Sequence, residues 1–125
     1  MTRWLVLALA AASLLGLGGC AADPPTPPPE VVDGDVQRGL RLIEHYGCGT
    51  CHAVPGVPGA EGQVGPPLAG IGNRSYLGGR LTNNATNMQR WMRNPQEVDP
   101  GTAMPDLGVT EADALDLTAF LFTLK

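Results

Sequence analysis

Aromatic side chains are scarce in this sequence: two each of Phe, Tyr and Trp make up only 5% of 125 residues. Glycine and proline, by contrast, number 17 and 12. The length suits one small domain, and such a composition leaves it few large side chains with which to fill a core. An additional apolar body inside the fold would supply the missing volume.

Positive charge is also in short supply. Eight Lys and Arg residues face twelve Asp and Glu residues, which gives a formal net charge of −4 and a pI near 4.9. This balance argues against nucleic-acid binding, which requires basic patches. The sequence also lacks any strong strand pattern, so an all-α fold is expected.

Cysteine is rare, but two of the three cysteines stand in the run Cys48-Gly49-Thr50-Cys51-His52. This pattern, C-x-x-C-H, is the attachment signature of a c-type haem. Each thiol adds to one haem vinyl group, and the adjacent histidine becomes an axial ligand of the iron. The sequence therefore predicts one covalently attached haem c, bound through Cys48 and Cys51 and ligated by His52.

A zinc-binding interaction module is a rival interpretation of Cys48, Cys51 and His52. It is weak, because the chain has no suitably placed fourth Cys or His. The second histidine, His45, precedes His52 by seven residues on the same side of the attachment site. We therefore read His45 as a surface residue.

The sixth iron ligand is expected from a methionine, a soft thioether that favours ferrous iron. Met88 and Met92 lie at core spacing on a predicted helix and are read as packing residues. Met104 lies instead in the loop Pro-Gly-Thr-Ala-Met-Pro, where little else explains an apolar side chain. The candidate ligand is therefore Met104.

The N-terminal segment has the layout of a secretory signal: a basic start, an apolar run and small residues before Cys20. Residues 1–19 resemble a lipoprotein signal peptide, which implies lipidation of Cys20. The alternatives are ordinary cleavage or a retained anchor, although ~14–16 apolar residues fall short of the ~20 that span a bilayer. Residues 20–32 are proline-rich and predict an extended tether. We expect an exported protein, lipid-anchored to a bacterial membrane, with its domain on the periplasmic or extracytoplasmic side.

Residues 33–125 are predicted to form the folded domain. Helical spacing and capping residues predict a first helix over 35–46, a second that Thr86 caps and that runs to about Arg93, and a last helix capped by Thr110. Residues 53–65 read as a loop, and 73–82 as a polar stretch with one short helical turn. In Gly65-Pro66-Pro67-Leu68, a proline carbonyl is one candidate partner for the His52 Nδ1 proton, and an ordinary rigid turn is the other.

The order of these features resembles class I cytochrome c across residues 33–125. The resemblance implies three to five helices wrapped around one covalently attached haem. It also implies that the first and last helices cross closely. The residues at that crossing are Gly39, Ile43, Leu117 and Phe120, and Ile43 stands where the family has an aromatic residue.

The stretch from Leu77 to Pro105 is especially similar to the cytochrome c domain fused to the copper subunit of some haem-copper oxidases. That likeness implies that the Pro66 carbonyl pairs with the axial histidine and that Leu68 packs on the haem. No copper-site residues are present, so the oxidase subunit itself is excluded. The positions expected near the haem propionates are Tyr76, Arg80, Asn83 and Trp91.

With both axial positions filled, the iron has no vacancy for substrate, and no general base or nucleophile is apparent. The sequence therefore predicts an electron carrier and not an enzyme. It would move single electrons in a respiratory chain, to or from a terminal oxidase or a quinol-oxidising complex. The alternative is a haem-based ligand sensor or a peroxidase-like enzyme in which Met104 is displaced.

Overall fold

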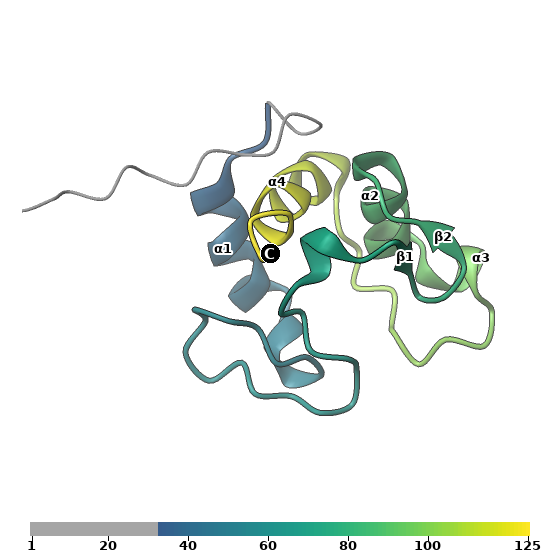
Figure 1. Cartoon of the computed structure of the whole chain (residues 1–125), viewed down its shortest axis with the longest axis horizontal. Helices are drawn as coiled ribbons and strands as arrows, with labels where there is room; N and C mark the ends of the chain where they lie inside the picture. The colour runs from purple at the N-terminus through teal and green to yellow at the C-terminus, as the bar shows by residue number, and fades with distance from the viewer. Residues whose placement is uncertain (1–32) are drawn as a thin grey trace, which may run out of the picture.

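The computed structural model describes residues 33–125, which form a mainly helical domain (Figure 1). The signal segment, Cys20 and the tether lie outside the described residues. Within 33–125, no helix is long and apolar enough to cross a membrane.

The expected all-α class is confirmed, with one small two-stranded sheet added. In chain order, the elements are α1 (Val36–His45), η2 (Cys48–Thr50), η3 (Ile71–Asn73), β1 (Tyr76–Leu77), β2 (Leu81–Thr82), α2 (Ala85–Arg93), α3 (Pro95–Val98) and α4 (Glu111–Leu121).

Helices α1 and α4 begin where their capping residues predict. The Asp35 side chain accepts a hydrogen bond from the Arg38 backbone N–H at 2.9 Å. The Thr110 hydroxyl accepts one from the Asp113 N–H at 3.1 Å. Each bond satisfies a backbone donor that the first turn of a helix leaves without a partner. Local sequence is therefore sufficient to start both helices.

The crossing of α1 over α4 forms the centre of the core (Figure 1). Ile43 and Leu117 are each only 1% exposed there. Burying a side chain of this size stabilises a fold by roughly 1.5–3 kcal/mol. Gly39 lies directly against α4, since a Cβ at this position would be 2.8 Å from the Cβ of Phe120. The predicted close approach through these four residues is confirmed.

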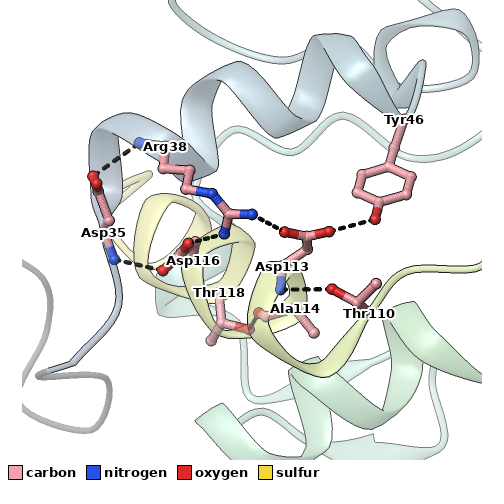
Figure 2. A network of polar contacts seen from close by, with 8 residues as sticks. All are labelled: Asp35, Arg38, Tyr46, Thr110, Asp113, Ala114, Asp116 and Thr118. Atoms are coloured by element: carbon pink, nitrogen blue, oxygen red, sulfur yellow. Dashed lines mark hydrogen bonds and ion pairs between the residues drawn. The ribbon is translucent and has the colours of Figure 1, made fainter.

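A polar network joins the same two helices along one side (Figure 2). The Arg38 guanidinium donates to the carboxylates of Asp113 and Asp116. Tyr46 donates its hydroxyl proton to Asp113 at 2.6 Å, and the Asp35 backbone N–H donates to Asp116 at 2.7 Å. The Tyr46 hydrogen bond, together with Arg38, holds the pKa of Asp113 below its ordinary value. The Asp113 carboxylate thus ties α4 to α1.

The start of α2 corrects the sequence prediction. Asn84, not Thr86, caps this helix, and its side chain accepts a hydrogen bond from the Asn87 N–H at 2.9 Å. Asn is as good a cap as Thr, and it lies two residues earlier with extended backbone geometry. Thr86 therefore lies inside the first turn. Helix α2 ends at Arg93, as predicted.

Three further elements, β1, β2 and α3, differ from the sequence prediction. The expectation of no strand is wrong at β1 and β2, which pair antiparallel around Gly78 and Gly79, both with positive φ. Strands of two residues are too short for alternation to reveal them. The helical turn expected within 73–82 lies earlier, at Ile71–Asn73. Finally, Pro95 begins α3, because proline suits the first turn of a helix.

Candidate functional site

A single tight turn directly after α1 holds the C-x-x-C-H run. Gly47 adopts a left-handed conformation, with φ +67°, and redirects the chain into η2. The His52 N–H then donates to the Cys48 carbonyl at 3.0 Å. Side chains three positions apart on a 3₁₀ turn lie above one another. The turn therefore sets the thiols of Cys48 and Cys51 on the same side.

Both cysteines of this turn are free thiols and half-buried. Burial raises the pKa of the Cys48 thiol, because a low-dielectric environment disfavours the thiolate. The Cys48 side chain also packs against the buried apolar cluster of the domain. It therefore faces the core instead of open solvent.

The His52 ring is oriented by the loop that follows. Its Nδ1 lies 2.7 Å from the Pro66 carbonyl oxygen, so the expected contact is present. A carbonyl can only accept, so Nδ1 must carry the proton and the lone pair resides on Nε2. Nε2 is thereby the ring nitrogen available to a metal.

Two residues that support His52 escaped sequence reasoning. Gly65 lies against the imidazole, since a Cβ there would be 2.3 Å from the His52 Cε1. Arg74 donates to the carbonyls of Pro67 and Ala69, at 2.5 and 3.1 Å. Both contacts stabilise the segment that carries Pro66. Only the glycine before two prolines hinted at such tight packing, and nothing in the sequence indicated the role of Arg74.

Met104 is half-buried against the same apolar cluster that Cys48 and Leu68 contact. The two helical methionines are core residues, since Met88 is 2% and Met92 is 7% exposed. His45 is exposed at the end of α1. Among these candidates, Met104 alone combines partial exposure with a position in a loop.

The four positions expected near the propionates lie on or beside the β1–β2 hairpin, and each side chain has surroundings of its own. Tyr76 is 63% exposed. Arg80 pairs with Asp99 at 3.4 Å, and the half-buried Trp91 ring lies beneath Gly78. Asn83 donates to the carbonyls of Ile71 and Arg74, each at 2.8 Å. No hydrogen bond joins these four side chains to one another within residues 33–125.

These residues fit the haem that the C-x-x-C-H run implies. A six-coordinate haem c requires two thiols for attachment to its vinyl groups and two axial donors for its iron, and here an imidazole Nε2 and a thioether could supply the axial donors. In addition, Asn83 Oδ1 is buried and has no hydrogen-bond partner in the described part of the chain. Such an acceptor calls for a donor, which a water would supply.

Comparison with known proteins identifies the class to which this site belongs. The family model for cytochrome c matches residues 36–125. Cytochrome c oxidase subunit 2 of Alkalihalophilus pseudofirmus is 36% identical over 89 residues, which cover 70% of this chain and 25% of the relative. Subunit 2 from Bacillus sp. strain PS3 is 34% identical over 99 residues, which cover 76% of this chain and 28% of the relative. Cytochrome c2 of Rhodoblastus acidophilus is 30% identical over 105 residues, which cover 74% of this chain and 94% of the relative.

The family match and the relatives place this helical domain, with its C-x-x-C-H turn, among the electron-transfer haem proteins. The chain belongs to the cytochrome c family. It spans about a quarter of the length of the oxidase subunits that it matches and nearly all of cytochrome c2.

Proposed function

We propose that this protein is a monohaem electron carrier whose haem is attached at Cys48 and Cys51 and ligated by His52 and Met104. The observation that carries the proposal is the 2.7 Å contact between His52 Nδ1 and the Pro66 carbonyl. This contact fixes the ring and raises the basicity of Nε2 toward a metal. The bound haem supplies a one-electron couple.

The protein's own residues would serve that couple by holding its surroundings still. The His52 ring is confined by Gly65 on its face and by Pro66 at its edge. Met104 is seated on the same core as Cys48. A protein that keeps both axial ligands in place in either oxidation state reorganises little when an electron passes. Such a site suits electron transfer better than substrate binding at the iron.

The proposed partners are a terminal oxidase or a quinol-oxidising complex of a respiratory chain. Support comes from relatives named cytochrome c oxidase subunit 2. This chain matches about a quarter of the length of each of them. The proposed location is the periplasmic or extracytoplasmic side of a bacterial membrane, with the domain tethered through lipidated Cys20 and residues 20–32. That part of the proposal rests on the signal-like N-terminal sequence.

Spectroscopy of the purified full-length protein tests this proposal. We expect haem to stay with the polypeptide after denaturation in acid acetone and the native ferric protein to be low-spin. The reduced protein should pass electrons to an oxidase without binding carbon monoxide. A high-spin resting state, or rapid carbon monoxide binding, would favour the ligand sensor or peroxidase-like enzyme. Loss of all haem on denaturation would contradict covalent attachment.

A further inference from the structure

The loop that carries Met104 is held to the rest of the domain by very few hydrogen bonds. Its first part is a series of turns, in which the Thr102 N–H donates to the Asp99 carbonyl at 3.0 Å. The Met104 N–H then donates to the Thr102 hydroxyl at 3.2 Å, which is a bond within the loop itself. Residues 103–109 take part in no backbone–backbone hydrogen bond within the described chain.

One side chain from outside the loop reaches the Met104 backbone. The Gln96 Nε2 donates to the Met104 carbonyl oxygen at 2.5 Å. This carbonyl precedes Pro105, which has no N–H and so adds no donor to the segment. The Gln96 amide thereby connects α3 to the residue whose side chain is the candidate sixth ligand.

The backbone of Gln96 is well placed to act as a fixed support. Pro95, beside it, is fully buried, and the Asp99 N–H closes the short helix by donating to the Pro95 carbonyl at 2.9 Å. Gln96 itself is exposed, so its side chain contributes little to the core. The exposed Gln96 amide therefore joins the Met104 loop to a helix that is anchored in the core. We call this hydrogen bond between Gln96 and the Met104 carbonyl the latch.

We propose that Gln96 is a positioning residue that holds Met104 against the iron and limits opening of the sixth coordination site. This inference rests on the proposed function, because it takes Met104 to be the axial ligand. Without the Gln96 donor, the Met104 carbonyl has no tie to α3, and the loop opens more often. An external ligand then competes more successfully for the iron.

Imidazole titration of the purified full-length ferric protein tests the proposal. Gln96→Glu is nearly isosteric but replaces the N–H donor with a carboxylate oxygen. We expect this variant to bind imidazole about fivefold more tightly than wild type, the factor that corresponds to the ~1 kcal/mol net value of a neutral hydrogen bond. Gln96→Arg retains an N–H donor and should restore an affinity near that of wild type.

Glu97→Gln is the matched control. Glu97 is the next residue on α3. Its side chain accepts a hydrogen bond from Arg90 at 2.8 Å and makes none to the Met104 loop within the described residues. This variant should bind imidazole as wild type does. An unchanged affinity in Gln96→Glu, or an equal gain in Glu97→Gln, would overturn the latch.

Two further readouts separate the latch from the ligand assignment. If wild-type ferric protein lacks the charge-transfer band of a methionine–iron bond, Met104 is not the ligand and the proposed function fails on that point. Hydrogen exchange does not depend on the iron band. The amides of Thr102 and Met104 should exchange about fivefold faster in Gln96→Glu than in Glu97→Gln. Equal exchange would refute the latch even where the band is present.

Discussion

The backbone of Gly39 on α1 touches that of Asp116 on α4 so closely that a Cβ at position 39 would lie 2.1 Å from the Asp116 carbonyl oxygen. Backbone atoms cannot swing aside as a flexible side chain can. The contact sets how closely the two helices approach, and therefore where the attachment turn after α1 stands relative to α4.

Gly39→Ala should therefore destabilise the protein. On an exposed helical surface the same change would stabilise by about 1 kcal/mol. Here we expect a loss of roughly 1–3 kcal/mol or more, because the added methyl group overpacks the crossing. Guanidinium unfolding of the haem-loaded protein measures it, with Gln37→Ala on the exposed side of α1 as control. A Gly39→Ala midpoint equal to or above wild type would contradict the close packing.

Tyr46→Phe should lower stability in a pH-dependent way. Because the folded-state pKa of Asp113 is lowered, first by Tyr46 and also by Arg38, its ionised form stabilises the fold above ~4, the unfolded pKa of Asp. That contribution is lost as the pH falls through the folded-state pKa. We expect a cost of about 1 kcal/mol at pH 7 and a smaller one at pH 3.

Urea unfolding at pH 7, 5 and 3 measures this difference. Tyr76→Phe, at a tyrosine that is 63% exposed, is the control and should have no effect. A Tyr46→Phe cost that stays constant with pH would mean that the hydroxyl does not act through the Asp113 carboxylate.

Gly65→Ala should disturb the site without replacing either proposed iron ligand. The new methyl group would lie 2.6 Å from His52 Nδ1, so the ring must move away from the Pro66 carbonyl. We expect a stability loss of about 1–3 kcal/mol and a smaller low-spin fraction of the ferric protein. Absorption spectra and thermal unfolding measure both. Gly101→Ala is the matched control, since its Cβ would meet only an Asp99 oxygen at 3.7 Å.

Met104→Ala should leave the haem covalently attached but open the sixth site. Loss of the thioether removes preferential stabilisation of ferrous iron, so the reduction potential should fall by on the order of 0.1 V, within the ~0.8 V that axial ligands span. Redox titration and carbon monoxide binding measure the change. Met92 is a buried residue of α2, so the control variant Met92→Leu should retain the wild-type reduction potential. An unchanged reduction potential in Met104→Ala would show that Met104 is not the sixth ligand of the iron.

Cys20→Ser should release the protein from membranes. The prediction follows from the signal-like N-terminal residues, because lipid chains on Cys20 would provide the anchor and residues 20–32 would act only as a tether. Cell fractionation with and without detergent measures the distribution. Cys48→Ser, which leaves the lipidation position intact, should keep its polypeptide in the membrane fraction. A Cys20→Ser protein that stays membrane-bound would show that the anchor is of another kind.

The sequence by itself determined the features that depend on neighbouring residues. The C-x-x-C-H turn, the caps at Asp35 and Thr110, and the end of α2 are set by contacts within a few positions, so a linear pattern reveals them. Even here, competition between similar residues limits the prediction: Asn84 and Thr86 are both good caps, and the earlier one began the helix. The two-residue strands were too short to leave a pattern.

Only the tertiary structure decided which distant residues meet. Arg38 finds its carboxylates 75 and 78 positions away, and Gly39 reveals its contact only where α4 crosses it. The C-x-x-C-H run identified His52, but the contact with the Pro66 carbonyl decided which of its ring nitrogens keeps a lone pair. Gln96 likewise has no motif of its own. Its bond to Met104 exists because α3 is anchored by a buried proline and the loop returns to it. Local sequence specifies which groups are present, and chain packing specifies which of them touch.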